Sequence, residues 1–321
     1  MTEPQATVYE VMAAAIAREL RDSELWFLGM STGPQTILML TRLPIVAMSL
    51  AQHTHAPNSW MLVAGWVMNP DTSKVPTRME SEFGTALGEW PSEAFNNSLT
   101  MSYVAARHEI DVGFGSAAQV DKYGNCNTVA IGDYHKPKVR LVGPINQPGH
   151  FSLFGREIII MPHEKRNFVD RVDFVSGAGF LEGPGCREKL GLRGGGPFMI
   201  LTDKAVFRFD EKSKLATLES VHPGINVDDV VQNTGYTHDY MPATVRKTAP
   251  PTPEELGLIR EVIDPSATML PHWNSSGKKN PHSQHQRPAF SFACPCAVLL
   301  HDAAAVVRTS ASSPGSLATA F

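Results

Sequence analysis

Residues 113–118, Gly-Phe-Gly-Ser-Ala-Ala, form a glycine-rich segment that could bind a ligand through its backbone. Glycine has no side chain, so a backbone that carries it can approach a ligand closely. The spacing fits a loose dinucleotide-binding pattern, in which a helix begins at the loop and faces the pyrophosphate. Residues 121–125, Asp-Lys-Tyr-Gly-Asn, follow almost at once and predict a turn instead. A nucleotide-binding oxidoreductase is therefore an alternative that rests on this glycine pattern alone.

Pairs of histidine and cysteine residues could hold a metal ion, but each pair is incomplete. His163 is followed by a glutamate, as in zinc proteases, yet Asn167 stands where their second histidine is needed. His53 and His55 have no acidic or cysteine ligand beside them. The pair Cys294–Cys296 has neither a second pair nor a nearby histidine. We therefore predict no metal site.

The composition narrows the class of protein further. The chain has 321 residues, of which 42% are hydrophobic and 19% charged, as in a globular protein. The formal net charge of −4 gives no basic field that would attract nucleic acid. No apolar run approaches the roughly 18 residues that span a bilayer. The acidic N-terminus lacks the features of a signal peptide, so we expect a cytoplasmic protein with reduced cysteines.

Short apolar strands alternate with helical patterns along most of the chain, which predicts an α/β fold. We expect an open, largely parallel sheet flanked by helices, with an appended hairpin at 206–209 and 215–218. Two helices carry capping boxes, Thr7 with Glu10 and Thr252 with Glu255. The predicted strands are 25–28, 61–63, 110–112, 157–161, 172–175 and 199–201, and the predicted helices are 8–20, 93–107, 228–233 and one that follows Thr252.

The character of the sequence changes after Trp273. Residues 274–321 are rich in Ser, Ala, Pro and His and contain one acidic residue, Asp302. Such a composition lacks the apolar periodicity that would offset the entropy of ordering. We therefore predict one domain over residues 1–273 and a disordered tail over residues 274–321.

Longer stretches of the sequence resemble one enzyme family. Residues 119–138 contain Gln-Val-Asp-Lys-Tyr-Gly-Asn-Cys-Asn and then Ile-Gly-Asp-Tyr-His-Lys-Pro-Lys. Residues 158–166 read Ile-Ile-Ile-Met-Pro-His-Glu-Lys-Arg, and residues 183–192 read Gly-Pro-Gly-Cys-Arg-Glu-Lys-Leu-Gly-Leu. Together with 222–223, 233–235 and 258–265, these stretches resemble the β subunits of family I coenzyme A-transferases, in the glutaconate branch. The resemblance covers about residues 8–266, with gaps.

The resemblance implies an open α/β subunit that pairs with a homologous α-type subunit, as a heterodimer or a higher heteromer. The active site would lie between the two subunits and bind an acyl-CoA with a dicarboxylic or glutaconate-like acyl group. Coenzyme A would be part of the substrate, with no further cofactor. The residues that would line the acyl-thioester site are Gly29, Gly33, Gly113, Gly115 and Gln119. Backbone N–H groups there would stabilise the oxyanion of an attacked thioester.

One position departs from the family pattern. In the transferases a glutamate carboxylate attacks the acyl-CoA and becomes a glutamyl-CoA thioester. The signature before that glutamate corresponds to Ala56-Pro57-Asn58 and the strand that follows, which places the nucleophile position at Ala64. Alanine cannot be acylated. A second departure is an apparent insertion at residues 35–42, which leaves the acyl-group preference open.

Several interpretations of Ala64 stay open. A local shift in register would bring Glu80 or Glu82 into the site and preserve CoA transfer. Loss of the nucleophile would instead leave the acyl-CoA pocket for ring-opening hydrolysis or decarboxylation, as in some relatives of the family, with the catalytic acid on the partner subunit. The chain could also be a non-catalytic scaffold. Loss of the nucleophile is the interpretation that we favour.

Overall fold

The computed structural model describes residues 6–30, 34–76 and 85–271, which belong to one compact unit. Gly33, Glu80, Glu82, Cys294, Cys296 and the predicted tail lie outside the described residues. Within those residues, no helix is both long and apolar enough to cross a membrane.

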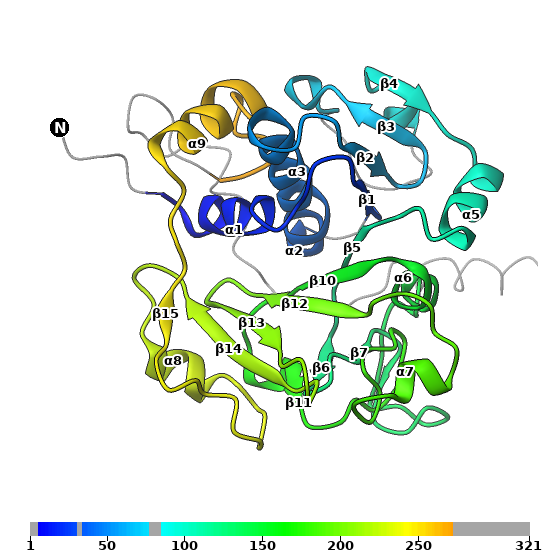
Figure 1. Ribbon diagram of the computed structural model, residues 1–321, viewed down its shortest axis with the longest axis vertical. Helices are drawn as coiled ribbons and strands as arrows, with labels where there is room; N and C mark the ends of the chain where they lie inside the picture. The colour runs from blue at the N-terminus through cyan, green and yellow to red at the C-terminus, as the bar shows by residue number, and fades with distance from the viewer. Residues whose placement is uncertain (1–5, 31–33, 77–84, 272–321) are drawn as a thin grey trace, which may run out of the picture. The chain divides into compact units, whose positions relative to one another are not determined.

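A ten-stranded sheet forms the centre of the unit, in the order β15-β14-β13-β12-β10-β5-β1-β2-β3-β4 (Figure 1). The five central strands, β12, β10, β5, β1 and β2, run parallel, whereas β13 and β14 on one side and β3 and β4 on the other pair antiparallel. Their bounds are β1 Leu25–Leu28, β2 Trp60–Val63, β3 Val67–Pro70, β4 Ser92–Phe95, β5 Val112–Gly115, β10 Arg156–Ile160, β12 Pro197–Leu201, β13 Ala205–Phe209, β14 Ala216–Val221 and β15 Arg246–Lys247.

Helices cover both faces of this sheet. Figure 1 shows α1 (Val8–Ala17), α3 (Leu43–Thr54) and α9 (Pro253–Gly257) together on one side. The apolar faces of α1 and α3, and Ile259 and Ile263 just after α9, share one core cluster with the strand residues Leu28, Val63 and Ile158. On the other face, Phe27 and Leu62 pack with Phe154, which directly follows α6 (Gln147–Leu153), and with side chains of α5 (Ser98–Ala106).

Local sequence signals account for several of these elements. Both predicted capping boxes are present, with Thr7 and Glu10 at the start of α1 and Thr252 and Glu255 at the start of α9. The helix after Thr252 continues as a π-helical segment, Leu258–Ile263. The predicted helix at 228–233 is α8, Val227–Gln232, and the predicted hairpin is formed by β13 and β14, which continue the main sheet.

Three predicted elements differ from the structure. Residues 93–95, expected at the start of a helix, belong to β4 because they pair with β3, and the helix α5 begins only at Ser98. The strand expected at 110–112 runs from Val112 to Gly115. No strand forms at 172–175; a short strand lies earlier, at Phe168–Val169 (β11), and pairs with Gln119–Asp121 (β6) in a small second sheet.

The apparent insertion at 35–42 is helical. It contains the end of the short helix α2, Pro34–Ile37, and a π-helical segment, Leu38–Arg42, that leads directly into α3. Leu38 and Met39 belong to the core cluster under α3, so this segment is packed into the fold.

Candidate active site at the ends of the parallel strands

The strand order creates a switch point next to strand β1. From β1 the chain moves to β2 and onward in one direction, whereas β5 lies on the other side of β1 and is followed by β10 in the opposite direction. All four strands are parallel, so their carboxyl ends meet at one edge of the sheet. Ligands of open α/β sheets bind outside the carboxyl ends of strands at such a switch point. This edge is the candidate active site.

The register of the strands brings three predicted site positions into one row. Leu28 lies opposite Val63 on β2 and opposite Phe114 on β5. The next residue along each strand is therefore Gly29, Ala64 and Gly115, with Gly29 in the middle. A methyl group added at Gly29 would meet no atom of the described residues within 4 Å, so this part of the chain leaves open space beside the backbone there.

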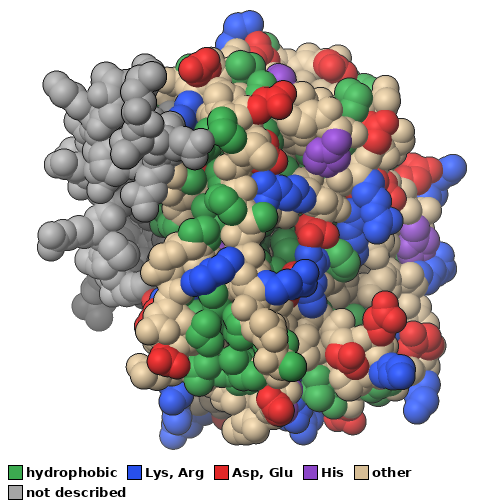
Figure 2. Space-filling view, turned by 60° about the vertical axis from the view of Figure 1, so that its left-hand side comes forward, with side chains coloured by type: hydrophobic (Ala, Val, Ile, Leu, Met, Phe, Trp, Pro, Cys, Tyr) green, Lys and Arg blue, Asp and Glu red, His purple; other side chains and the backbone are tan. Residues whose placement is uncertain are grey.

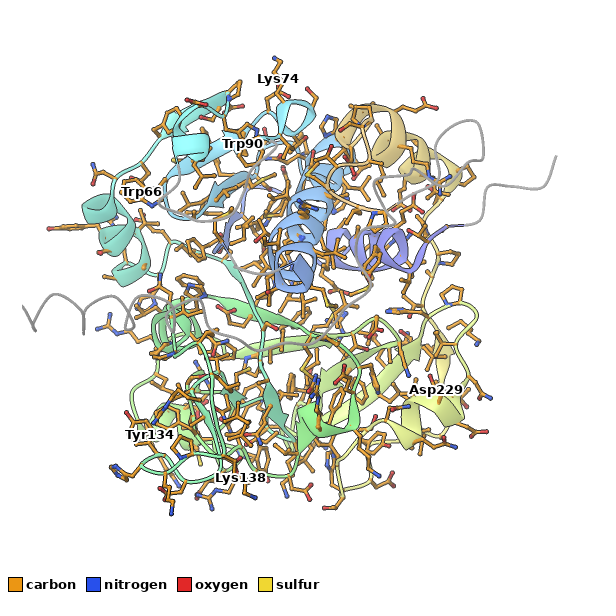
Figure 3. All side chains as sticks on the ribbon, turned by 180° about the vertical axis from the view of Figure 1, so that it is seen from behind. Trp66, Lys74, Trp90, Tyr134, Lys138 and Asp229 are labelled. Carbon is orange, nitrogen blue, oxygen red and sulfur yellow. The ribbon has the colours of Figure 1, made fainter. Side chains whose placement is uncertain are left out.

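Ala64 occupies a tight turn between β2 and β3. The N–H of Trp66 donates to the carbonyl of Val63 at 3.0 Å and closes the turn. Ala64 and Gly65 have φ angles of +55° and +75°, in the left-handed region that glycine favours. Ala64 is 8% exposed, whereas Trp66 is 37% exposed. Figure 3 labels Trp66, in the half of the unit that holds strands β1 to β4. The position that we predict for the family's nucleophile therefore carries a small apolar side chain.

Three carboxylates near these strands are engaged by other groups. Glu24 and Asp111 precede strands β1 and β5, at the opposite edge of the sheet, where Glu24 pairs with Arg156 at 2.8 Å and Asp111 accepts from the N–H of Leu25. Asp71, the first carboxylate after Ala64, caps a 3-10 turn and pairs with Lys74 at 2.8 Å. Glu24 and Asp111 lie a strand's length from the row of Gly29, Ala64 and Gly115, and Asp71 is engaged by Lys74.

The side chain of Gln119 is held by protein partners. Its Nε2 donates to Asp173 at 3.0 Å, and its Oε1 accepts from Asn127 Nδ2 at 2.7 Å. These bonds fix the loop that follows β5. Gln147 of α6 supports the same loop, because its amide donates to the carbonyl of Ser116. No local sequence signal pointed to Gln147, since its partner is 31 residues away.

Gly113 and Gly115 are packed against a buried glutamate. Glu157 of β10 lies opposite Gly113 in the sheet, and a methyl group added at Gly113 would lie 2.1 Å from Glu157 Oε1. At Gly115 the nearest atom would be Phe151 Cε2 at 3.3 Å. Burial raises the pKa of Glu157 well above its usual range. No sequence pattern pointed to this carboxyl group, because Glu157 simply begins an apolar run.

The structure brings together the predicted site positions that it describes, and Gly33 lies outside the described residues. Gly29, Ala64 and Gly115 share one row. Gly113 lies two residues before Gly115 on β5, and Gln119 follows the loop after that strand. Their contact with an acyl-CoA stays a prediction. In the part of the chain that the structure describes, no cluster of three His, Cys, Asp or Glu side chains could hold a metal ion. His163, one of the residues considered as a ligand, is buried and contacts Thr202 and Thr234.

Comparisons with known proteins agree with this architecture. The family model described as coenzyme A transferase matches residues 9–233. The B-type subunit of glutaconate CoA-transferase from Acidaminococcus fermentans is 33% identical over 264 residues, which cover 81% of this chain and 94% of that protein. The cholesterol ring-cleaving hydrolase IpdB subunit of Mycobacterium tuberculosis is 29% identical over 82% of this chain and 96% of that protein.

Solved structures agree as well. The crystal structure of the Acidaminococcus fermentans glutaconate CoA-transferase superposes with a TM-score of 0.69 at 30% identity, covering 83% of this chain and 98% of that one. The residues that match the family model include the parallel strands and the turn that carries Ala64. On these grounds the chain belongs to the coenzyme A transferase family.

Proposed function

We propose that this chain is the β-type subunit of a heteromeric enzyme that acts on an acyl-CoA, and that its own usual nucleophile is replaced by Ala64. The observation that carries the proposal is the row of Gly29, Ala64 and Gly115 at the switch point of the sheet. The row provides backbone groups and open space for a thioester. At the position where the family pattern has a carboxylate, however, it carries the methyl group of Ala64.

The chemistry follows from that methyl group. Transfer by the ping-pong route needs a carboxylate that attacks the thioester carbonyl and holds the acyl group. Ala64 offers none, and Asp71 is engaged by Lys74 and Ser73. Backbone donors near the glycine turn would still stabilise an oxyanion. We therefore expect the acyl-CoA pocket to work with an acid from the partner, in CoA release, ring opening or decarboxylation.

A second candidate function is ordinary CoA transfer to a dicarboxylic or glutaconate-like acid. The similarity to the B-type subunit of glutaconate CoA-transferase favours it, since that relative is more similar to this chain than the ring-cleaving hydrolase subunit is. It requires a carboxylate from the segment at Glu80 and Glu82, outside the described residues, to reach the row at Ala64.

The partner is proposed to be a homologous α-type subunit, because one half of the site cannot enclose a CoA thioester. Both relatives are named as subunits of larger enzymes. Large apolar side chains also reach the surface of this chain, among them Trp66, Phe95 and Tyr103, which are 37%, 56% and 72% exposed. Figure 2 presents a different side of the molecule and shows further apolar side chains gathered on it. Such side chains are typical of surfaces that a partner covers.

The test is a covalent trap on the assembled enzyme. The chain is expressed together with an α-type subunit encoded beside it, incubated with acyl-CoA and treated with borohydride, which reduces glutamyl-CoA thioesters. We expect no glutamate reduced to its alcohol by peptide mass spectrometry, no loss of activity, and turnover without an acceptor acid. Glutaconate CoA-transferase treated in parallel serves as the positive control.

Two results would contradict the proposal. Borohydride inactivation with a modified Glu80 or Glu82 would establish the second candidate, an ordinary transferase subunit. A well-behaved, active homo-oligomer of this chain alone would contradict the proposed heteromer.

A further inference from the structure

A buried polar cluster lies directly behind the candidate site. Glu157 on β10 is fully buried, and its side chain extends across β5 into the space left by the missing side chains of Gly113 and Gly115. His150 of α6 covers it from the helix side, with Nδ1 at 4.0 Å from Glu157 Oε1. The cluster is therefore formed by a sheet residue, a helix residue and two glycines of the strand that ends at the site.

Aromatic rings enclose the two titratable groups. The His150 ring stacks on Phe154 at 4.6 Å and meets the edge of Phe27 at 4.7 Å between ring centroids. Among the described residues, neither oxygen of Glu157 and neither ring nitrogen of His150 has a hydrogen-bond partner. A charge on either group would thus be desolvated without direct compensation, which is strongly unfavourable.

The remaining charged and titratable groups that face the pair do not supply that compensation. Arg187 of α7 (Cys186–Lys189) favours the ionised form of Glu157, but it acts from a distance. Its NH1 and NH2 donate to the carbonyls of Ala178, Gly179, Phe151 and Gly194. The pKa of the Cys126 thiol, on β7 (Cys126–Asn127), is raised by burial and further by a negative charge at Asp121 or Glu157.

We propose that Glu157 is a protonated, neutral carboxylic acid and forms an uncharged pair with a neutral His150. Glu157 also acts as a positioning residue, because it holds the end of strand β5 at Gly113 and Gly115 in place. The close fit carries the positioning role: with a side chain at residue 113 the carboxyl group could not occupy its place, so the carboxyl and the glycines define each other's position. The importance of this strand end for turnover rests on the proposed function, whereas the protonation state does not.

The electrostatics agree with the geometry. Burial raises the pKa of Glu157 well above its usual range, and the distant Arg187 opposes this only in part. Burial also lowers the pKa of His150 to about 3. Folding therefore takes up a proton at Glu157. Since its folded-state pKa is the higher one, the stabilising contribution is complete below the unfolded pKa near 4.5 and is lost as the pH rises through the folded pKa.

Infrared spectroscopy of the assembled enzyme tests the protonation directly. A neutral carboxylic acid shows a C=O stretch separate from that of a carboxylate, and ¹³C-labelled glutamate moves the band and distinguishes Glu157 from the aspartates. We expect this glutamic acid band at neutral pH in the wild type and its loss in Glu157→Gln. Its absence from the labelled wild type at neutral pH would overturn the proposal, even if the variant failed to fold.

A matched control is Glu10→Gln. Glu10 is equally buried, but its carboxylate is held by Arg260 at 2.6 Å and by the N–H of Thr7 at 2.7 Å. The Glu10 variant should therefore keep the neutral-acid band. If the band disappeared in Glu10→Gln and persisted in Glu157→Gln, the assignment to Glu157 would be wrong.

The positioning role has a kinetic readout. The wild-type kcat for acyl-CoA turnover should decline at alkaline pH as Glu157 ionises, and this decline should vanish in Glu157→Gln but persist in Glu10→Gln. An unchanged decline in Glu157→Gln would overturn the positioning role. An enzyme inactive on acyl-CoA that still shows the glutamic acid band would instead refute the proposed function and leave the neutral pair established.

Discussion

The backbone N–H of Ala64 donates a 2.7 Å hydrogen bond to the carbonyl of Leu28, which extends the pairing of β2 with β1 by one residue. The turn at Ala64 is therefore placed by main-chain atoms and not by its side chain. A change of residue type at position 64 can alter the chemistry of the site while the strands keep their register. This explains how the fold can accommodate alanine at the position that we predict for the family's nucleophile.

Ala64→Glu should create a trappable carboxylate. The substitution places a glutamate beside Gly29, where open space borders the backbone. The positive φ of 55° makes any side chain there cost about 1 kcal/mol, but the alanine already carries this cost. We expect a borohydride-sensitive CoA adduct on the new carboxylate at position 64 of the assembled enzyme, measured by peptide mass spectrometry.

The control for this substitution is Trp60→Glu. Trp60 is 41% exposed and begins the same strand, so the substitution introduces a carboxylate at the opposite end of β2. The control should form no adduct. If Ala64→Glu also formed none while it folded and bound acyl-CoA, position 64 would not face the thioester. A displacement of about 1 Å would reduce the yield without abolishing it, since such a displacement costs about a hundredfold in rate.

Alanine substitutions at Gly113 and Gly115 should differ in their effect on stability. A methyl group at Gly113 would lie 2.1 Å from Glu157 and 2.6 Å from Phe154, whereas at Gly115 the closest atom is 3.3 Å away. We expect Gly113→Ala to destabilise the enzyme by about 1–3 kcal/mol, as overpacking of a core does, and Gly115→Ala by less. Urea unfolding of the assembled enzyme at fixed concentration measures both.

A double-mutant cycle identifies Glu157 as the cause. In a Glu157→Ala background the clash with the carboxyl group is gone, whereas the contact with Phe154 remains. The cost of Gly113→Ala should therefore be smaller in this background than in the wild type, while the cost of Gly115→Ala should change less. Equal costs of Gly113→Ala in the two backgrounds would mean that the carboxyl group does not fill this space.

Local signals in the sequence were sufficient for the outer elements of the fold. The capping boxes at Thr7 and Thr252 predict the starts of α1 and α9, because cap and partner lie only three residues apart. The resemblance identified the family. The order of the strands was not predictable from periodicity, because pairs such as β5 with β10 join residues more than 40 positions apart.

The glycine strand and the buried glutamate show why the rest was missed. Gly113 and Gly115 have low strand propensity, so the predicted strand ended before them. They are in the strand because Glu157 and Phe151 fill the space beside them. The prediction for residues 172–175 was wrong in the opposite direction, because their apolar character suggested a strand that does not form. Their side chains instead contact a neighbouring loop: Asp173 accepts from the N–H of Gly132, and Phe174 stacks on Tyr134 at 5.2 Å.

Truncation after Trp273 should leave the enzyme intact. Met269 and Leu270, near the end of the described residues, are buried in the main core cluster. The composition of residues 274–321 predicts that they add no apolar contacts. We expect the melting temperature and the acyl-CoA activity of the truncated complex to equal those of the full chain. A fall in melting temperature of several degrees would show that the tail contributes to the fold.

His163 should make the enzyme sensitive to acid. Its ring is buried between Phe168 and Phe207, at 4.7 and 6.0 Å between centroids, and its nitrogens lie 2.9 Å from Thr202 Oγ1 and 3.1 Å from Thr234 Oγ1. Burial lowers the pKa of His163 to about 4, with the hydrogen bond to the Val230 carbonyl acting in the opposite direction. The imidazole is thus neutral in the folded chain at neutral pH.

The sign of the effect follows from the depressed pKa. The contribution of neutral His163 to stability is fully present above the unfolded pKa of 6.5 and is lost as the pH falls toward about 4. The loss amounts to about 3 kcal/mol at most, since one pKa unit corresponds to about 1.4 kcal/mol. His163→Gln should be less stable than the wild type at pH 7, and this difference should shrink toward pH 4. Urea unfolding across this range measures it, with the exposed His135→Gln as a control that should show no such trend. A difference that stays constant with pH would mean that His163 is protonated in the folded enzyme as readily as in the unfolded chain.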